Sequence, residues 1–304
     1  MLIGVVIVTY NRLEKLKIAL DSFDKQTKKP AYILVINNKS TDNTSEFLKN
    51  WQKDEREYRK YDIEMKENLG GSGGFYEGLK ESLNLNADWI WVSDDDAFPE
   101  KDVIEKAENF LEHYKNKNEL AAICTKVCNN GRIDYWHRYK VKKGILKLHT
   151  VLSDEEDYKK EKFDINQFSY VGTIMNKEYL KKYGITNKEY FIHYDDSEHS
   201  YRLSKYGKIL CVPSMTVHHD TGEAKNEADW KVYYHIRNRL HYYKSIGKRF
   251  FWVEYLKTKI SLVVKKILKY NIYKHKLLED AINDAKNDKL GKHEIYIPGW
   301  NFKK

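Results

Sequence analysis

Short apolar runs and amphipathic segments alternate over the first 125 residues of the chain. Between the runs, apolar residues recur every three or four positions, as on one face of a helix; Leu13, Leu16 and Leu20 are one such set. The runs, each predicted to be a buried strand, cover residues 2–8, 32–36, 61–66, 89–92 and 120–125. This alternation predicts an α/β fold: a mostly parallel, twisted sheet with helices on both faces.

The pattern changes after residue 128. Charged turns over residues 129–167 favour hairpins and a loop. The later apolar runs predict strands at 168–175 and 208–212, with helices near 177–183 and up to about 206. The remainder, from about residue 227, has a helical pattern. We therefore expect a unit of residues 1–226, with halves 1–128 and 129–226, and a helical extension at 227–304.

Composition is typical of a folded globular protein, with 41% hydrophobic and 33% charged residues. The net charge of +9 is unevenly distributed. Residues 231–304 hold 18 Lys and Arg against 6 Asp and Glu, or +12, which leaves −3 for residues 1–230. A basic tail on a slightly acidic body indicates contact with an anionic surface, either membrane or nucleic acid.

The three cysteines, Cys124, Cys128 and Cys211, are odd in number and form no C-x-x-C pair. They predict reduced thiols in a cytoplasmic protein, with no disulfide framework and no zinc site. The first apolar run has no basic segment before it and no small-residue cleavage site after it, so we expect a strand there and no targeting segment. No apolar run approaches the roughly 18 residues of a membrane span.

Polar clusters follow the first four predicted strands. Ligands bind at the carboxyl ends of the strands in parallel sheets, so these clusters are expected to meet at one binding edge. Any single cluster also suits an ordinary polar turn, but four in succession favour a site. The clusters are Thr9-Tyr10-Asn11-Arg12, Asn37-Asn38-Lys39-Ser40-Thr41-Asp42, Asn68-Leu69-Gly70-Gly71-Ser72-Gly73-Gly74-Phe75 and Ser93-Asp94-Asp95-Asp96.

The Asp94-Asp95-Asp96 cluster is the most informative of the four. Adjacent carboxylates repel one another, so the cluster is costly unless a cation is bound. Asp94 and Asp96 are two positions apart and project to the same side of an extended backbone. Such a pair suits a hard divalent cation that shares oxygen ligands with phosphates. For Asp95 the alternative is an acidic turn that caps the next helix.

The glycine-rich segment does not match the P-loop, because no Lys-Ser/Thr pair follows its last glycine, and it does not match G-x-G-x-x-G. It predicts a strand–glycine loop–helix unit whose backbone can approach a ligand closely. Together, and in this order, the four clusters resemble the nucleotide-sugar half of inverting family 2 glycosyltransferases with the Rossmann-like GT-A fold. The Asn-Leu-Gly-Gly-Ser-Gly-Gly-Phe form resembles the branch of bacterial galactofuranosyltransferases and rhamnosyltransferases.

This resemblance implies that the donor is a nucleotide diphosphate sugar, in which the sugar is linked to UDP or dTDP. Asn37 departs from the branch, which usually has Asp beside the nucleotide base, although an amide still accepts a hydrogen bond. The residues that we expect to bind the donor are Thr9, Asn11, Arg12, Asn38, Asn68, Gly70, Gly71, Gly73, Asp94 and Asp95.

The resemblance continues in the segment from Phe191 to Glu198. Asp195 and Glu198 have the spacing of a capping box for the following helix, which predicts a structural role for both. Asp196 has no such role, and the resemblance implies that it is the general base that deprotonates the acceptor hydroxyl. A positioned base contributes about 10²–10⁴-fold in rate.

His218 and His219 follow the predicted strand at 208–212. A single histidine is more often structural than a ligand. In the galactofuranosyltransferase branch, however, the histidine of a Val-x-His sequence completes the metal site, and this position corresponds to His219. With Asp94 and Asp96 it implies Mn²⁺ or Mg²⁺, since imidazole suits Mn²⁺ better than Ca²⁺. The run from Asp229 to Leu240 also resembles the branch, and its Arg and His side chains either contact phosphates or form a solvated face.

Residues 250–269 predict an amphipathic helix. Its apolar stripe favours packing on the body of the protein, which is the usual arrangement. Its lysines and aromatic residues at one end also suit anionic lipid headgroups, and we expect peripheral contact with the inner face of the membrane. The stripe consists of Val253, Leu256, Ile260, Val263, Val264 and Ile267, flanked by Lys259, Lys265, Lys266 and Lys269.

The sequence thus predicts an inverting, metal-dependent enzyme that transfers galactofuranose from UDP-galactofuranose to a cell-surface glycan or lipid-linked oligosaccharide. The alternative donor is dTDP-rhamnose. A nucleotidyltransferase would not need the Asp196 segment, and a nucleic-acid-binding protein leaves the triple Asp unexplained, because carboxylates repel phosphate unless a metal intervenes. We therefore expect no nucleic acid partner.

Overall fold

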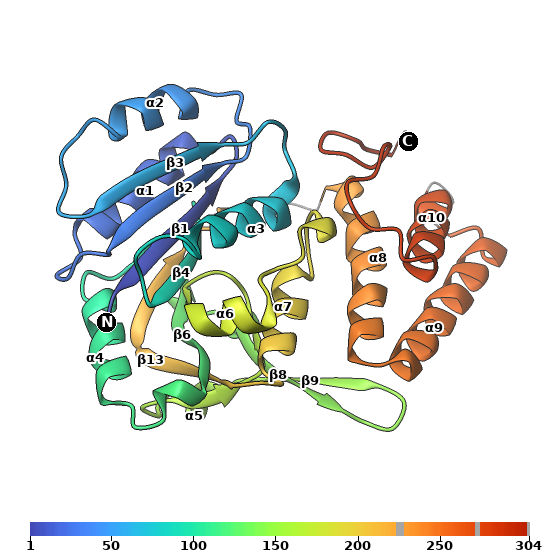
Figure 1. The fold of residues 1–304 in the computed structure, drawn as a ribbon. Coiled ribbons are helices and arrows are strands. Elements are labelled where there is room, and N and C mark those ends of the chain that lie inside the picture. Colours follow the sequence, from blue (N-terminus) through green and yellow to red (C-terminus); the bar gives the residue numbers. More distant parts are fainter. Residues whose placement is uncertain (223–227, 271–273, 303–304) are drawn as a thin grey trace.

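A ten-stranded sheet forms the centre of the protein, whose computed structural model describes residues 1–222, 228–270 and 274–302 (Figure 1). Its main path runs β10-β13-β6-β12-β4-β1-β2-β3; β5 pairs with β13 and β7 with β6. The strands β3, β2, β1 and β4 are parallel neighbours, and β12 is antiparallel to both β4 and β6. The prediction of a mostly parallel α/β sheet is confirmed.

The strands of this sheet are β1 (Ile3–Thr9), β2 (Tyr32–Asn37), β3 (Arg59–Glu64), β4 (Trp89–Asp94), β5 (Ala97–Pro99), β6 (Leu120–Asn129), β7 (Arg132–Ile133), β10 (Phe163–Ile165), β12 (Thr173–Asn176) and β13 (Lys208–His219). The helices of the body are α1 (Leu13–Asp24), α2 (Thr44–Trp51), α3 (Gly70–Ser82), α4 (Val103–His113), α5 (Glu155–Tyr158), α6 (Lys177–Tyr183) and α7 (Asp195–Leu203). Short 3₁₀ turns cover Lys117–Glu119, Tyr135–His137 and Lys188–Tyr190.

Alternate side chains of β1 enter two separate cores. Ile3, Val5 and Ile7 pack with apolar residues of α1, α2 and α4. Val6 and Val8 face the other way and pack with residues of α3, α6 and α7. Because successive side chains of a strand point to opposite faces, a continuously apolar strand requires cover on both sides. This arrangement leaves the carboxyl ends of the central strands free for a site.

The run at 168–175 is not one strand, contrary to our prediction. β11 (Gln167–Phe168) belongs to a small three-stranded sheet with β8 (Arg138–Lys143) and β9 (Leu148–Leu152). β12 then joins the large sheet, and Gly172 lies between the two strands with a φ of +66°. This left-handed conformation suits glycine and lets the chain pass from one sheet to the other. The hairpin expected between residues 129 and 167 is β8–β9.

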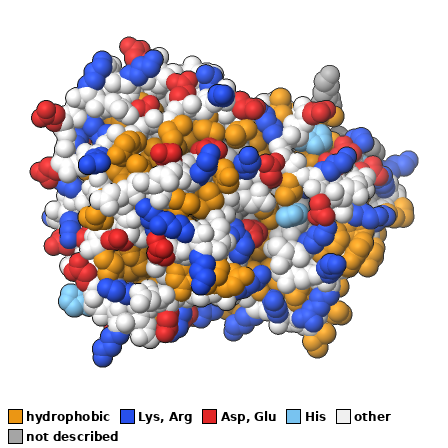
Figure 2. Space-filling model, in the orientation of Figure 1, with side chains coloured by type: hydrophobic (Ala, Val, Ile, Leu, Met, Phe, Trp, Pro, Cys, Tyr) orange, Lys and Arg blue, Asp and Glu red, His pale blue; other side chains and the backbone are white. Residues whose placement is uncertain are grey.

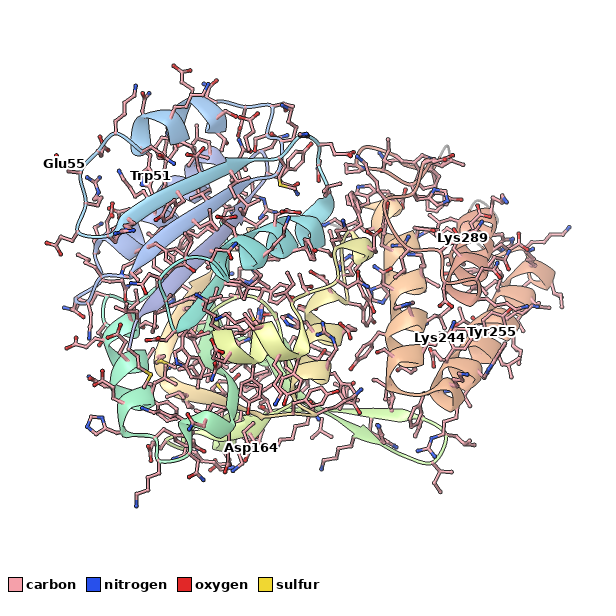
Figure 3. The ribbon with its side chains drawn as sticks, in the orientation of Figure 1. Trp51, Glu55, Asp164, Lys244, Tyr255 and Lys289 are labelled. Carbon is pink, nitrogen blue, oxygen red and sulfur yellow. The ribbon has the colours of Figure 1, made fainter. Side chains whose placement is uncertain are left out.

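Three helices form a layer beside the body: α8 (Asp229–Ile246), α9 (Lys248–Ile267) and α10 (His275–Lys286) (Figure 1). Tyr255, marked in Figure 3, is buried in a cluster with Leu240 of α8 and Ile282 of α10. No helix among the described residues is long and apolar enough to cross a membrane.

The apolar stripe of α9 does not pack on the body, which corrects the simpler of our two expectations for this helix. The side chains that α9 buries are Phe250, Phe251, Tyr255 and Leu262. Leu256 and Ile260, in contrast, are 53% and 62% exposed, and Ile267 is 74% exposed. Figure 2 shows hydrophobic side chains among Lys and Arg on this side of the molecule. Phe251 and Tyr255 fill the helical layer, and the aliphatic stripe of α9 is left outside it.

Candidate active site

The ends of β1 and β2 are tied together by side chains of the first two polar clusters. Thr9 is in register with Asn37. Asn11 Oδ1 accepts a hydrogen bond from the Thr41 N–H at 2.7 Å, and the backbone N–H of Asn11 donates to Ser40 Oγ at 3.0 Å. Asn37 Nδ2 donates to Ser45 Oγ at 2.9 Å, and its Oδ1 accepts from the Ser40 N–H. The amides of Asn11 and Asn37 therefore shape the turn.

The glycine-rich segment becomes the first turn of α3, at the same edge of the sheet. Asn38 Nδ2 donates to the Gly70 carbonyl at 2.8 Å and to Asn68 Oδ1 at 3.2 Å. Gly70 has a φ of +71°, and a side chain there would collide with the Phe191 backbone. Gly73 packs directly on Leu69, whereas Gly71 faces open space. The Gly70 N–H donates to Asn68 Oδ1 at 2.8 Å and the Ser72 N–H to the Phe191 carbonyl at 3.2 Å, so the start of this helix favours an anion through its dipole.

A cavity of about 260 Å³ opens at these strand ends. Eight of the ten residues predicted to bind the donor line it: Thr9, Arg12, Asn38, Asn68, Gly70, Gly71, Asp94 and Asp95. The lining does not include Asn11 or Gly73, which are placed in the adjoining turn and in α3. Its other lining residues are Val8, Tyr10, Phe191, Ile192, Trp230, Lys231 and Pro298.

The structure brings Asp94, Asp96 and His219 together. One ligand atom from each of the three lies within 4.8 Å of the others. Asp94 ends β4, and the chain turns into β5, whose Ala97 pairs with His219 of β13. This pairing places His219 Nε2 at 3.3 Å from Asp96 Oδ1. The cluster is therefore built by sheet pairing between segments more than a hundred residues apart.

Asp95 turns away from this cluster. Its carboxylate accepts hydrogen bonds from Thr9 Oγ1 at 2.8 Å and from Arg12 Nη1 at 3.3 Å. The same Arg12 nitrogen lies 2.6 Å from Asp96 Oδ2. Asp95 is 3% exposed, and the residue that precedes α4 is Asp102, so a solvated capping turn does not describe Asp95. It anchors Arg12 at the edge of the cavity.

The carboxyl groups differ in their affinity for protons. Burial, followed by repulsion from Asp96, raises the pKa of Asp94 to about 7. Burial also raises the pKa of Asp95, to about 6, against the charge of Arg12. For Asp96, burial acts in the same direction, but the hydrogen bond and charge of His219 outweigh it and lower the pKa. A buried acidic cluster of this kind is stabilised by a bound cation.

The surroundings of His219 suit a residue that binds a metal ion. Its Nδ1 is buried and has no hydrogen-bond partner among the residues that the structure describes. Burial would lower the pKa of His219, but the hydrogen bond and charge of Asp96 raise it. His137 packs edge-on against the ring at 5.1 Å and fixes its orientation. Two carboxylates and one imidazole are a donor set that Mn²⁺ accepts and that also permits Mg²⁺.

The segment before α7 is strained. Phe191, His193 and Tyr194 are not glycines, yet their φ angles are +65°, +65° and +66°. Asn238 of α8 holds this segment: its Nδ2 donates to the carbonyls of Tyr190 and Ile192 at 2.8 Å and of His193 at 3.1 Å. Backbone strain of this kind is concentrated at functional sites.

The capping box expected for Asp195 and Glu198 does not form. Tyr194 occupies the N-cap position of α7 without a side-chain cap, and Glu198 accepts from Arg202 Nε at 2.9 Å. Asp195 is 8% exposed, and burial, followed by the charge of Asp196, raises its pKa to about 8. The charge of Asp94 acts in the same direction, so the structure places the two acidic segments close enough to interact.

Asp196 is partly exposed. Its Oδ1 accepts from the Ser197 N–H at 2.6 Å and from Ser197 Oγ at 3.2 Å. Burial raises the pKa of Asp196, and these two hydrogen bonds oppose the rise. The second oxygen of a carboxylate held in this way is available to accept a proton.

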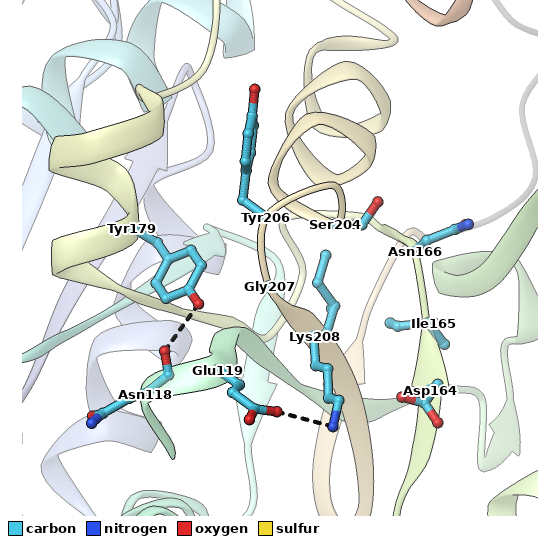
Figure 4. Close-up of a pocket in the computed structure, with 11 residues that line it drawn as sticks. Asn118, Glu119, Asp164, Ile165, Asn166, Tyr179, Ser204, Tyr206, Gly207 and Lys208 are labelled. Atoms are coloured by element: carbon cyan, nitrogen blue, oxygen red, sulfur yellow. Dashed lines mark hydrogen bonds and ion pairs between the residues drawn. The ribbon is translucent and has the colours of Figure 1, made fainter. Parts of the chain in front are cut away.

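A larger hollow, of about 460 Å³, lies where β6 and β13 begin (Figure 4). Tyr179 donates from its hydroxyl to the Asn118 carbonyl at 2.9 Å, and Lys208 pairs with Glu119 at 3.1 Å. None of the predicted site residues lines it. It lies at the amino ends of these strands, so the smaller cavity remains the candidate site.

The fold and this site define an α/β protein whose cavity and candidate metal cluster lie at the carboxyl ends of parallel strands. The family model described as "Glycosyl transferase family 2" matches residues 4–184. This is more than half of the chain, which therefore belongs to glycosyl transferase family 2, and the predicted family is confirmed.

Among curated proteins, the chain is similar to galactofuranosyltransferase GlfT1 of Mycolicibacterium smegmatis, with 33% identity over 124 residues. This match covers 41% of the chain and 38% of the relative. GlfT1 of Mycobacterium tuberculosis is 31% identical over 125 residues, which are 41% of the chain and 39% of the relative. The matched part is thus less than half the length of these relatives.

Among solved structures, S. aureus TarS 1–349 has a TM-score of 0.58 at 15% identity, with 94% of this chain and 81% of that one covered. GalNAc-T7, solved with UDP, GalNAc and Mn²⁺, has a TM-score of 0.59 at 15% identity, with 80% and 48% covered. At such identities these likenesses show the fold alone, and they confirm the GT-A arrangement.

Proposed function

We propose that the chain is an inverting, metal-dependent glycosyltransferase that transfers galactofuranose from UDP-galactofuranose to a hydroxyl of a cell-surface glycan or lipid-linked oligosaccharide. The observation that carries the proposal is the convergence of Asp94, Asp96 and His219 beside one cavity. The likeness to GlfT1 favours galactofuranose as the sugar. Residues 1–226 would form the catalytic unit and residues 227–304 an extension of it.

In this proposal the nucleotide diphosphate lies in the cavity at the ends of β1, β2 and β4. The start of α3 supplies a partial positive charge beside the diphosphate, and Arg12 supplies a full positive charge. Asn38 holds the loop that leads into α3. GalNAc-T7 has been solved with UDP and TarS with UDP-GlcNAc, which supports a donor whose nucleotide is UDP.

Asp94, Asp96 and His219 would hold Mn²⁺ or Mg²⁺ in this site. The ion supplies Lewis acidity that neutralises the charge growing on the departing diphosphate. The low pKa of Asp96 keeps that carboxylate ionised. Asp94, with a pKa of about 7, would ionise fully when a cation is present.

Asp196 would act as general base. It takes the proton of the acceptor hydroxyl while the hydroxyl oxygen attacks the anomeric carbon from the face opposite the diphosphate. The bond between the anomeric carbon and the diphosphate oxygen breaks in the same step, so the anomeric centre is inverted. The hydrogen bonds from Ser197 fix one carboxylate oxygen and leave the other for this proton.

The test is a donor assay with the purified chain. UDP-galactofuranose and dTDP-rhamnose are each supplied with an acceptor glycan, with and without Mn²⁺, and the released nucleotide is measured. We expect release of UDP that depends on Mn²⁺ and is lost in Asp94→Asn. Asp164→Asn is the matched control, because Asp164 lies in the remote hollow. Turnover of dTDP-rhamnose alone would establish the alternative donor, and turnover of neither would refute the proposal.

We further propose that α9 contacts an anionic membrane from its cytoplasmic side. Its exposed stripe includes Leu256, Ile260 and Ile267. Six lysines lie on the same helix and just past its end, at Lys248, Lys257, Lys259, Lys265, Lys266 and Lys269. Apolar side chains flanked by lysines bind both the acyl boundary and anionic headgroups. A lipid-linked acceptor would be presented at such a surface.

Co-sedimentation with vesicles tests this contact. We expect binding to vesicles rich in phosphatidylglycerol, weaker binding to phosphatidylcholine, and a marked loss in Ile260→Ser/Ile267→Ser. Ile145→Ser is the control, because Ile145 is 84% exposed and lies outside α9. Equal binding of the wild type to both lipids, or equal loss in the control, would contradict the proposal. Binding to arbitrary DNA in its place would favour a nucleic-acid partner.

A further inference from the structure

The candidate donor cavity is completed by the C-terminal part of the chain. Trp230 and Lys231 of α8, and Pro298 beyond α10, line it together with residues of β1 and α3. All three lie outside residues 4–184, the part that matches the family model. In Figure 1 the chain after α10 returns along α8 to the level of α3. One wall of the cavity therefore comes from the extension.

Aromatic rings hold this wall together. Trp230 packs against Phe191 and Tyr234, with ring centroids 6.1 and 5.8 Å apart. Tyr296 stacks on Tyr233 at 4.8 Å, and Trp300 meets the ring of Tyr296 edge-on at 4.9 Å. Buried aromatic contacts of this kind fix both the start of α8 and the chain around Pro298.

Hydrogen bonds join the same segment to the donor loops. The Gly291 N–H donates to the Glu189 carbonyl at 2.6 Å, and Arg237 Nη1 donates to the Gly291 carbonyl at 2.7 Å. Lys292 Nζ donates to the Asn68 carbonyl at 3.2 Å. Asn68 itself lines the cavity. The segment is thus anchored on both sides of the cavity and not attached to the helical layer alone.

Lys231 brings a positive charge to this wall. Its Nζ lies 5.7 Å from the centroid of the Trp230 ring. It forms no ion pair with any residue in the described part of the chain. Arg12, the other cation of the cavity, is already bound to Asp95 and Asp96. Lys231 is therefore the cation whose charge is available to a ligand without breaking an existing pair.

We propose that Lys231 binds the diphosphate of the nucleotide-sugar donor, and that residues 291–302 hold the wall from which it acts. This inference rests on the proposed function, because it takes the cavity to be the donor site. A charge-assisted hydrogen bond to a phosphate oxygen is stronger than a neutral one. The extension is then part of the catalytic site as well as a candidate membrane contact.

The experiment is calorimetric titration of the full chain with UDP and with uridine, in the presence of Mn²⁺. We expect Lys231→Met to weaken UDP binding by about ten- to a hundredfold, since hydrogen bonds to charged groups are of this strength. Uridine lacks phosphate, so its affinity should be unchanged. Lys231→Arg should restore most of the loss because it retains the charge.

Lys244→Met is the matched control. Lys244 lies near the other end of α8 (Figure 3). It pairs there with Asp288. Wild-type affinity for UDP in Lys231→Met, or an equal loss in Lys244→Met, would overturn the inference and leave the proposed function intact. A wild-type chain that binds neither UDP nor dTDP with Mn²⁺ would overturn both. Circular dichroism of each variant confirms that the fold is retained.

Discussion

Replacement of Asn238 by Ala should destabilise the protein through the strained segment before α7. Asn238 is fully buried, and its Nδ2 donates to the carbonyls of Tyr190, Ile192 and His193. Its Oδ1 accepts from Arg237 Nε at 2.8 Å. In the variant these groups lose a partner that no nearby side chain can replace in full.

The magnitude follows from the individual contacts. The Tyr190 carbonyl keeps a second donor, Arg237 Nη2 at 3.2 Å. The carbonyls of Ile192 and His193 lose the side-chain donor that Asn238 provides, and each unsatisfied buried group costs about 1–3 kcal/mol. Because both carbonyls are only partly buried, water would recover some of this energy. We therefore expect a loss of about 2–4 kcal/mol in the free energy of unfolding.

Urea unfolding at pH 7 measures this loss as a lower midpoint with an unchanged slope. Asn50→Ala is the control, since Asn50 is an exposed residue of α2 and should change the free energy of unfolding by no more than about 0.5 kcal/mol. A loss in Asn238→Ala below about 1 kcal/mol would show that the three carbonyls do not depend on this amide.

Three further predictions concern the acidic groups. Asp196→Asn should lower kcat by about a hundredfold or more and leave the dissociation constant for UDP almost unchanged, since only base catalysis is removed; unchanged turnover would exclude Asp196 as the base. Asp96→Ala should weaken Mn²⁺ binding, measured by electron paramagnetic resonance, by about tenfold or more; wild-type affinity would refute the metal site. Burial raises the pKa of Asp195 to about 8 from 3.8, so the folded chain binds the extra proton and its stability falls as the pH rises between these values. Asp195→Asn removes this pH dependence. The thermal midpoint of the variant minus that of the wild type should therefore be larger at pH 9 than at pH 5, and an equal difference at both pH values would contradict this reasoning.

Local pattern alone predicted the first half of the protein well. The apolar runs at 2–8 and 89–92 correspond to β1 and β4, because strands covered on both faces leave a clear hydrophobic signal. The prediction for 61–66 began two residues late and ended two late, since β3 is Arg59–Glu64, a strand at the end of the sheet with little apolar content. The residues that line the cavity could be predicted for the same reason, because most of them directly follow the predicted strands.

The acidic side chains show where a local pattern fails. The spacing of Asp195 and Glu198 suits a capping box, yet Tyr194 adopts a left-handed conformation and Asp195 is turned inward. Contacts from Asn238, more than forty residues further along the chain, hold the preceding carbonyls. A spacing rule describes what two residues can do in isolation, and the tertiary contact determines which conformation they adopt.

The sequence by itself determined the α/β class, the edge of the sheet at which the cavity lies and the Asp94–Asp96 cluster, because these depend on periodicity and on neighbours in the chain. Only the tertiary structure decided that α9 exposes its aliphatic stripe and that Lys231 and Pro298 line the cavity of Thr9. Both outcomes depend on how α8, α9 and α10 pack against one another and against the body. Such packing joins residues more than two hundred positions apart, and the period of a single helix carries no information about it.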